Sequence, residues 1–370
     1  MKKIIFFTGF LLLCFCIGVI GCTPVKNTYE RGFVATSDGS YEKTEAENSS
    51  PTISEQLTDN SKEVSEDLGN GVLKHGALKA INGKIVDKNG DNVVLRGMSS
   101  HGLVWFPEFT NKYSIGKTKE SGANVFRAAM YTEEYGGYTT GENEKQNSRK
   151  ILYSAVDNTI SLDMYVIIDW HILYDSNPQK HKSEALTFFD EVSKKYADNP
   201  AVIYEICNEP HGVSWKNDIK PYAEEIIPII RKNSPNALII VGSNTWSQDV
   251  DEAAEDLLDF ENIAYSFHFY SGTHKIDSFK PKIEKALSKG ATIFVTEWGT
   301  SEASGNDGNY FDEAYKWLDY LDEKEISRIN WSLCDKDESS AALLSGADPD
   351  NWNESNLSES GKFIFESFKR

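Results

Sequence analysis

Eight short apolar segments that alternate with helical patterns constrain the fold of this 370-residue chain more than any other feature. The segments are rich in β-branched and aromatic residues, as strands buried on both faces of a parallel sheet are. Strands that alternate with helices predict an α/β fold, and eight right-handed strand–helix units close into a (β/α)8 TIM barrel. The predicted strands are residues 93–98, 124–131, 165–171, 202–208, 238–242, 263–270, 292–297 and 328–333.

The stretches between the strands supply most of the helices that such a barrel needs. Amphipathic periodicity predicts helices near residues 148–162, 182–197, 217–233, 275–289, 309–323 and 358–368. Two further helices, between the first two strands and after the fifth, have only weak periodicity. Before the first strand, Asn82-Gly83 lies between two short apolar stretches, which is the signature of a β-hairpin. We expect this N-terminal β-hairpin, over residues 78–87, to close the bottom of the barrel.

The first 71 residues differ in composition from the rest. Lys2 and Lys3 precede an apolar run that ends at Ile20, and Cys22 follows a glycine, which is the pattern of a lipoprotein signal peptide. We predict a signal peptide at 1–21, lipidation of Cys22, a disordered acidic tether rich in Ser, Thr and Glu at 22–71, and one barrel domain at 72–370. The alternative for the apolar run is an uncleaved membrane anchor.

The net charge and the cysteine content argue against some classes of binding partner and against a disulfide-rich fold. The net charge is −19; residues 1–21 contribute +2 and residues 22–71 contribute −6, which leaves −15 for residues 72–370. A body this acidic disfavours nucleic acid and anionic lipid as partners and suits a neutral substrate. Beyond residue 22 only Cys207 and Cys334 remain, so we expect two free, buried thiols and no disulfide framework.

Two of the predicted strands lead into a glutamate that is followed by a chain breaker. Glu209 comes directly after the fourth strand and before Pro210, and Glu297 ends the seventh strand before Trp298-Gly299. The carboxyl ends of all eight strands meet at one rim of a β/α barrel. One such acid alone could cap a helix or pair with an arginine. Two at one rim supply the paired carboxylates that cleavage of a glycosidic bond requires.

Other residues at the same rim fit a sugar-binding cleft. Arg127 lies within an apolar strand and needs a buried acidic partner, either a rim carboxylate or an ion pair that serves only the fold. Imidazoles and flat indole faces suited to sugar rings lie at the strand ends and in the following loops, at His101, His171, His268, Trp105, Trp246 and Trp331. Three histidines at one rim leave zinc binding as an alternative. Because the two carboxylates already provide an acid and a nucleophile, we predict no metal and no cofactor.

Six segments at these strand ends, taken together, resemble glycoside hydrolase family 5 of clan A, and its bacterial cellulase branch most of all. They are LRGMSSHGL at 95–103, FRAAMY at 126–131, DWH at 169–171, EICNEP at 205–210, SFHFY at 266–270 and TEWG at 296–299. The closing stretch WSLCDKDESSA at 331–341 is also similar to that branch. The likeness covers nearly all of residues 72–370. One departure is Cys207, where the branch usually has a small residue such as Ala, and we expect only a packing effect there.

The resemblance implies roles for the matching residues. Glu209 resembles the acid/base and Glu297 the nucleophile of a retaining mechanism, with Arg127 and Tyr270 holding the nucleophile and Asn208 bonded to the sugar 2-hydroxyl. A polar shell is implied at His101, His171 and His268, a stacking floor at Trp331, a glycone site at Trp105, Ala303, Lys336 and Glu338, and further cleft positions at Tyr131 and Trp246. An acid must hold its proton while the nucleophile is ionised, so we expect contrasting environments and carboxyl groups about 5–5.5 Å apart.

These features lead to the hypothesis of a retaining endo-1,4-β-glucanase, a cellulase that acts on cellulose and related β-glucans. The same chemistry on mannan, xylan, lichenan or xyloglucan is the close alternative, and a catalytically silent surface glycan-binding protein is a more distant one. With the predicted lipid anchor, we expect an extracytoplasmic monomer at a bacterial cell surface or outer membrane, or released extracellularly, whose only membrane contact is the lipid.

Overall fold

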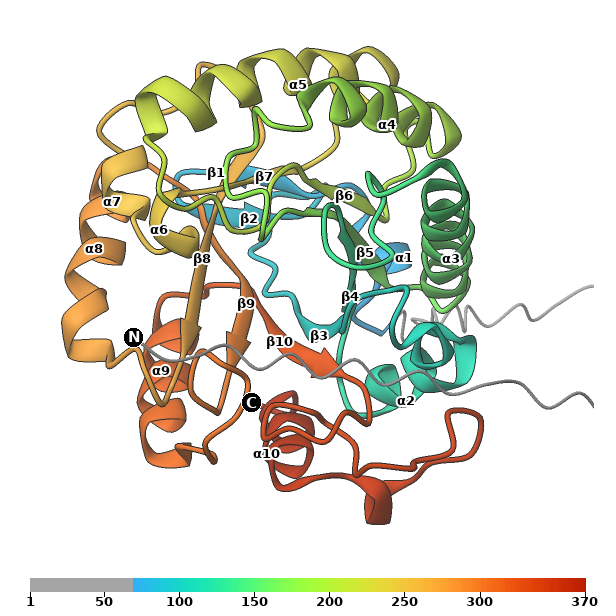
Figure 1. The fold of residues 1–370 in the computed structure, drawn as a ribbon. Helices are drawn as coiled ribbons and strands as arrows, with labels where there is room; N and C mark the ends of the chain where they lie inside the picture. Colours follow the sequence, from blue (N-terminus) through green and yellow to red (C-terminus); the bar gives the residue numbers. More distant parts are fainter. Residues whose placement is uncertain (1–68) are drawn as a thin grey trace, which may run out of the picture. The chain divides into compact units, whose positions relative to one another are not determined.

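The computed structural model describes residues 69–370, which form a closed barrel of eight parallel strands with helices around the outside (Figure 1). The strand order is β10-β3-β4-β5-β6-β7-β8-β9, so successive strands are neighbours and β10 closes on β3. The predicted (β/α)8 barrel is confirmed. The predicted signal peptide, Cys22 and nearly all of the 22–71 tether lie outside the described residues.

All eight predicted strands are present. They are β3 (Arg96–Ser100), β4 (Val125–Tyr131), β5 (Tyr165–His171), β6 (Val202–Glu205), β7 (Ile239–Gly242), β8 (Ile263–Tyr270), β9 (Ile293–Gly299) and β10 (Arg328–Leu333). The strand predicted at 202–208 ends three residues early, because its last parallel pairs are Asp169↔Glu205 and Glu205↔Ile240. Glu209 therefore stands in the loop after β6, whereas Glu297 is part of β9.

A helix is present at each stretch where periodicity predicts one, although α3 begins earlier than predicted, and the short α1 is not predicted. They are α1 (Val72–His75), α2 (Lys112–Glu120), α3 (Glu142–Ser161), α4 (Lys182–Lys195), α5 (Lys220–Asn233), α6 (Asn244–Ser247), α7 (Val250–Ala253), α8 (Ile276–Ser288), α9 (Phe311–Glu323) and α10 (Glu359–Ser367). The two weakly periodic ones are short: α2 follows a 3-10 turn at Pro107–Thr110, and only α6 and α7 follow β7. Within residues 69–370, none of the helices is both long and apolar enough to cross a membrane.

The bottom of the barrel is closed by the predicted hairpin. β1 (Lys79–Ile81) pairs antiparallel with β2 (Lys84–Val86). Leu78 and Ile85 of this hairpin pack with strand residues such as Ile203 and Ile240 in one buried cluster. Apolar side chains thus fill the lower interior, which leaves the opposite rim for polar groups.

The two cysteines of the described chain are free and buried, as predicted. Burial raises the pKa of the Cys334 thiol to about 12, and it also raises the pKa of Cys207. Thiols in such surroundings stay protonated and unreactive at neutral pH.

Candidate active site

Glu209 and Glu297 come together in one cleft of about 740 Å³ at the carboxyl ends of the strands. One carboxylate oxygen of each, together with a ring nitrogen of His268, lies within 4.8 Å of the others. Retaining glycosidases hold their two carboxyl groups about 5–5.5 Å apart, and inverting enzymes about 6.5–9.5 Å apart. The observed spacing fits direct attack by one carboxylate, as in a retaining enzyme.

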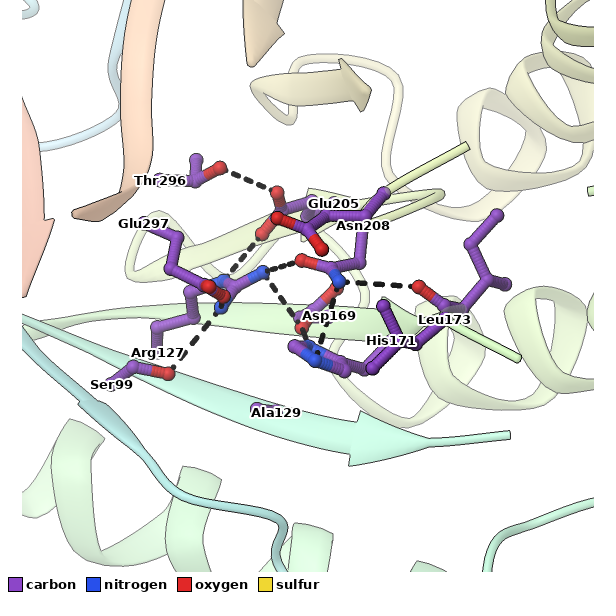
Figure 2. A network of polar contacts seen from close by, with 12 residues as sticks. Ser99, Arg127, Ala129, Asp169, His171, Leu173, Glu205, Asn208, Thr296 and Glu297 are labelled. Atoms are coloured by element: carbon purple, nitrogen blue, oxygen red, sulfur yellow. Dashed lines mark hydrogen bonds and ion pairs between the residues drawn. The ribbon is translucent and has the colours of Figure 1, made fainter. Parts of the chain in front are cut away.

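Arg127, on β4, lies beneath the cleft and contacts three carboxylates (Figure 2). Its Nη1 donates to Glu297 Oε2 at 3.0 Å, its Nε donates to Glu205 Oε2 at 2.7 Å, and its Nη2 lies 3.0 Å from Asp169 Oδ2. The guanidinium is fully buried. Burial raises the pKa of Asp169 to about 7, against the attraction of Arg127. One arginine is thus the shared ion-pair partner of three buried acids. Removal of the arginine would leave these acids buried without a cation, which is strongly destabilising.

Two of these acids, Asp169 and Glu205, are not predicted as partners of Arg127. The sequence indicates a single rim carboxylate for that role. The available signal is their place inside apolar strands, where an acid has no solvent to face and needs an internal cation. Sequence alone does not say that both acids meet the same arginine.

The nucleophile candidate is held at both oxygens. Arg127 donates to Glu297 Oε2, and the Tyr270 hydroxyl donates to Glu297 Oε1 at 2.7 Å. Burial, together with the nearby Glu297 charge, raises the pKa of Tyr270 well above its ordinary value, so its hydroxyl remains a donor. The carboxylate is therefore fixed in orientation before any substrate binds.

Glu209 has a different environment. Its side chain is mostly buried, and its Oε1 lies 2.8 Å from His268 Nδ1. Burial raises the pKa of Glu209 to about 8, and Arg127 opposes this only in part. A carboxyl group with such a pKa holds its proton at neutral pH, as a general acid must.

A chain of hydrogen bonds determines where that proton lies. Thr296 Oγ1 donates its only hydrogen to Glu205 Oε1 at 2.6 Å, so it accepts from His268 Nε2, which is 2.9 Å away. Burial lowers the pKa of His268 to about 4, so the imidazole is neutral and its single hydrogen is on Nε2. His268 Nδ1 is then an acceptor, and the Glu209 carboxyl is the donor. The chain favours the protonated form of Glu209.

Asn208 and His171 form the other side of the network around Arg127 (Figure 2). Asn208 Oδ1 accepts from Arg127 Nη2 at 2.6 Å, which turns its amide nitrogen toward the Ile172 carbonyl at 3.2 Å and His171 Nε2 at 3.3 Å. His171 Nδ1 lies 2.6 Å from Asp169 Oδ2, so its hydrogen is on Nδ1 and Nε2 accepts. The amide and ring orientations are therefore fixed by buried charges.

The other predicted sugar-binding residues line the cleft. These are His101, Trp105, Tyr131, His171, Trp246, His268, Tyr270, Ala303, Trp331, Lys336 and Glu338, whereas Arg127 and Asn208 lie beneath them. Lys336 Nζ pairs with Glu338 Oε2 at 2.5 Å, and Glu338 also lies 3.6 Å from His101 Nε2. Because His101, His171 and His268 engage different partners, their arrangement does not favour the zinc alternative.

One end of the cleft is a series of contacting rings. The ring of Trp105 lies 4.5 Å from that of Tyr131, which lies 4.1 Å from His171, which in turn stacks on Trp331 at 5.4 Å, between ring centroids. Flat faces with polar groups at their edges suit the two faces of a pyranose ring.

Some residues that line the cleft are missing from the sequence prediction. They are Glu134, Leu173, Tyr174, Thr245, Gln248, His274, Ser304 and Gly305. Thr245 lies in α6 and the others lie in loops, all of them in segments that follow strands and close to predicted residues. Their positions are the signal that could have found them, since every such loop of a β/α barrel borders the same face.

Comparison with known proteins gives consistent relatives. Residues 86–337 match the family model described as Cellulase (glycosyl hydrolase family 5). An endoglucanase of Clostridium saccharobutylicum is 52% identical over 295 residues, which are 79% of this chain and 65% of that protein. Endoglucanase A of Evansella cellulosilytica is 52% identical over 284 residues, which are 76% of this chain and 57% of that protein. The chain thus spans less than two thirds of the length of either relative.

Solved structures agree with these sequence relatives. Cellulase Cel5C_n superposes with a TM-score of 0.77 at 45% identity, covering 80% of this chain and 93% of that one. The catalytic domain of Thermobifida fusca endoglucanase Cel5A, in complex with cellotetraose, superposes with a TM-score of 0.77 at 33% identity, covering 82% of this chain and 100% of that one.

Proposed function

Because the chain belongs to glycosyl hydrolase family 5, we propose that it is a retaining endo-1,4-β-glucanase, a cellulase that hydrolyses internal bonds of cellulose and related β-glucans. The observation that carries the proposal is the pair of Glu209 and Glu297, which have the spacing of a retaining enzyme and contrasting surroundings. The relatives named endoglucanases and the cellotetraose bound to the Thermobifida fusca enzyme support a β-1,4-glucan as substrate.

The geometry accounts for both steps of a double displacement. In the first, Glu297 attacks the anomeric carbon while Glu209 gives its proton to the glycosidic oxygen, so the bond to the leaving sugar breaks and a glycosyl-enzyme forms. In the second, Glu209 takes a proton from water, whose oxygen attacks the same carbon and releases Glu297. Two inversions restore the original anomer. Arg127 and Tyr270 keep Glu297 oriented throughout.

Substitution of each glutamate tests these roles. Glu297→Gln removes the nucleophile, so activity on every substrate should be lost. Glu209→Gln removes protonation of the leaving group, a loss on the order of 10²–10⁴-fold. An activated aryl glycoside, whose leaving group needs no proton, should partly escape that loss in its first step. A 2-fluoroglycoside should label Glu297; a label on Glu209, or an inverted product anomer, would contradict the assignment.

The substrate preference is tested by reducing-end release from carboxymethylcellulose, lichenan, xyloglucan, galactomannan and xylan. Cleavage of the glucans with little action on galactomannan or xylan is the expected result. Cleavage of mannan without cleavage of glucan would show that the protein is a retaining hydrolase of mannan and not a cellulase. Oligosaccharide binding without any hydrolysis would instead indicate a silent glycan-binding protein.

We further propose that the protein is a lipid-anchored, extracytoplasmic monomer. The support is the lysine-led apolar run that ends before Cys22 and the acidic segment that follows it. In cells fed labelled palmitate, the protein should incorporate label, and Cys22→Ala should not. Label in the variant would argue against lipidation at this position.

A further inference from the structure

Trp246 is presented to the cleft by a strained backbone. Thr245, Trp246 and Ser247 have φ angles of 55°, 52° and 56°, in the left-handed region that non-glycine residues avoid. The Trp246 side chain nevertheless remains 44% exposed and lines the cleft beside Glu209. A large ring on a strained backbone that is only half covered gains little in the free protein, and such strain is typical of ligand-binding positions.

Hydrogen bonds from this strained segment attach it to the segment that carries Glu209. The Trp246 backbone N–H donates to the Pro210 carbonyl at 3.0 Å, and the Ser247 hydroxyl donates to the Asn208 carbonyl at 2.6 Å. Trp246 and Glu209 therefore lie in two loops that are hydrogen-bonded to each other and form one local unit.

His211 supports the indole directly. Its imidazole stacks on the Trp246 ring with 4.6 Å between centroids and an interplanar angle of 11°. Stacking of this kind fixes the plane of the indole and covers one of its faces. The exposed part of the ring remains in the cleft.

His211 is in turn fixed by the backbone. Its Nδ1 lies 3.0 Å from the Glu209 carbonyl oxygen, and since a carbonyl can only accept, Nδ1 carries the hydrogen. Its backbone N–H donates to the Ser176 carbonyl at 3.1 Å, in the loop after β5. One half-buried imidazole therefore joins the loops after β5, β6 and β7.

The position of this unit indicates which sugar it serves. Glu209 protonates the oxygen of the leaving sugar, so the loops that flank Glu209 border the leaving-group side. The ring series that runs from Trp105 to Trp331 comes instead from the loop after β3 and from the carboxyl-terminal parts of β4, β5 and β10. Trp246 and His211 thus face the sugar that departs.

We propose that His211 is a positioning residue that holds Trp246 as the stacking platform for the first sugar on the leaving-group side of the cleft. This inference rests on the proposed glucanase function. His211 acts through Trp246 and makes no contact with the reacting atoms, so its loss should weaken the binding of leaving sugars and spare the chemical step itself.

Two substrates separate these effects. Cellopentaose places sugars on both sides of the cleaved bond, whereas β-cellobiosyl fluoride has a single atom as its leaving group. For the full-length protein, His211→Ala should lower kcat/KM on cellopentaose roughly fivefold to tenfold, mainly through KM, because a stacked ring pair contributes about that factor. On the fluoride, kcat/KM should stay within about twofold. His211→Phe keeps a flat ring and should recover most of the loss.

His181→Ala is the matched control, since His181 is a partly exposed histidine of the neighbouring loop that does not line the cleft. It should leave both substrates unaffected. Equal loss on both substrates for His211→Ala, or no rescue by His211→Phe, would overturn the positioning role. An active wild type with an unaffected His211→Ala would overturn this inference alone, whereas a wild type inactive on both substrates would overturn the proposed function and this inference with it.

Discussion

Removal of the Thr296 hydroxyl should change the pH range in which the protein is active. In the native chain, Thr296 gives its hydrogen to Glu205 and accepts from His268 Nε2, which leaves His268 Nδ1 to accept the proton of Glu209. Thr296→Val keeps the shape of the side chain and removes the acceptor. The His268 Nε2–H then loses its acceptor, and Glu205 Oε1, at 4.0 Å, is too far away to replace it; the Ser266 hydroxyl also loses its contact with Thr296.

The size of the effect follows from that orphaned donor. A buried polar group without a partner costs about 1–3 kcal/mol. Moving the imidazole hydrogen to Nδ1 relieves this cost, but Nδ1 then donates toward Glu209 and favours its carboxylate form. Since 1.36 kcal/mol corresponds to about one pKa unit, the pKa of Glu209, about 8 in the native protein, should fall by roughly one to two units.

The sign of the activity change is fixed by the role of Glu209. A general acid works below its pKa and fails as the pH rises through it, so the alkaline limb of kcat/KM should move from about pH 8 to roughly 6–7. On cellopentaose, Thr296→Val should therefore resemble the native protein at pH 5 and lose roughly tenfold or more at pH 8. Thr296→Ser keeps the hydroxyl and should keep the native profile. An alkaline limb that stays in place in a folded Thr296→Val protein would refute the hydrogen-bond chain.

Three further changes test the framework of the barrel. Gly97→Ala should prevent stable folding, because the added Cβ would lie 1.8 Å from the Val125 carbonyl oxygen; soluble yield and urea unfolding measure this, and a native-like midpoint would contradict it. Asp322→Ala should lower the free energy of unfolding by about 2–3 kcal/mol, since the buried Arg328 would lose its carboxylate; a change within error in urea titration would argue that solvent replaces the pair. A protein that starts at Gly71 should keep its turnover and melting temperature, and a large fall in melting temperature would show that the predicted tether supports the barrel.

Much of the fold could be predicted because its signal is local. β5, β8 and β10 have the predicted bounds, since each is an apolar run closed by polar or turn residues. The predicted end of a strand is wrong where pairing with the neighbouring strands, and not the apolar pattern, determines it. Residues 206 and 207 continue the apolar pattern of β6, but the regular parallel ladder with β5 and β7 ends at Glu205, and only single backbone hydrogen bonds to Trp170, Ile240 and Gly242 continue beyond it. The start of α3 is not predicted because its first turns consist of polar residues and have no amphipathic periodicity.

The candidate site could be predicted as a set of residues but not as a set of contacts. Position at a strand end is visible in sequence, and it was enough to bring Glu209, Glu297 and the rim aromatics to one cleft. The direction of a hydrogen bond depends on which groups meet across the barrel. Nothing in the sequence distinguishes Glu205 from a simple ion-pair partner of Arg127, although it also accepts from Thr296.

The buried contacts explain how two glutamates in one cleft can hold different protonation states. Arg127 reaches Glu297 directly, so the nucleophile is under the immediate field of a cation. The charge of the same arginine only partly offsets the raised pKa of Glu209, and the hydrogen-bonded path between them runs through Glu205, Thr296 and His268, each of which determines the donor of the next bond. At the Glu209 end of this chain, His268 Nδ1 is an acceptor, which favours a proton on the Glu209 carboxyl group. The contrast between the two glutamates therefore has two sources: Arg127 donates directly to Glu297, whereas burial and the donor direction of the hydrogen-bond chain keep the proton on Glu209.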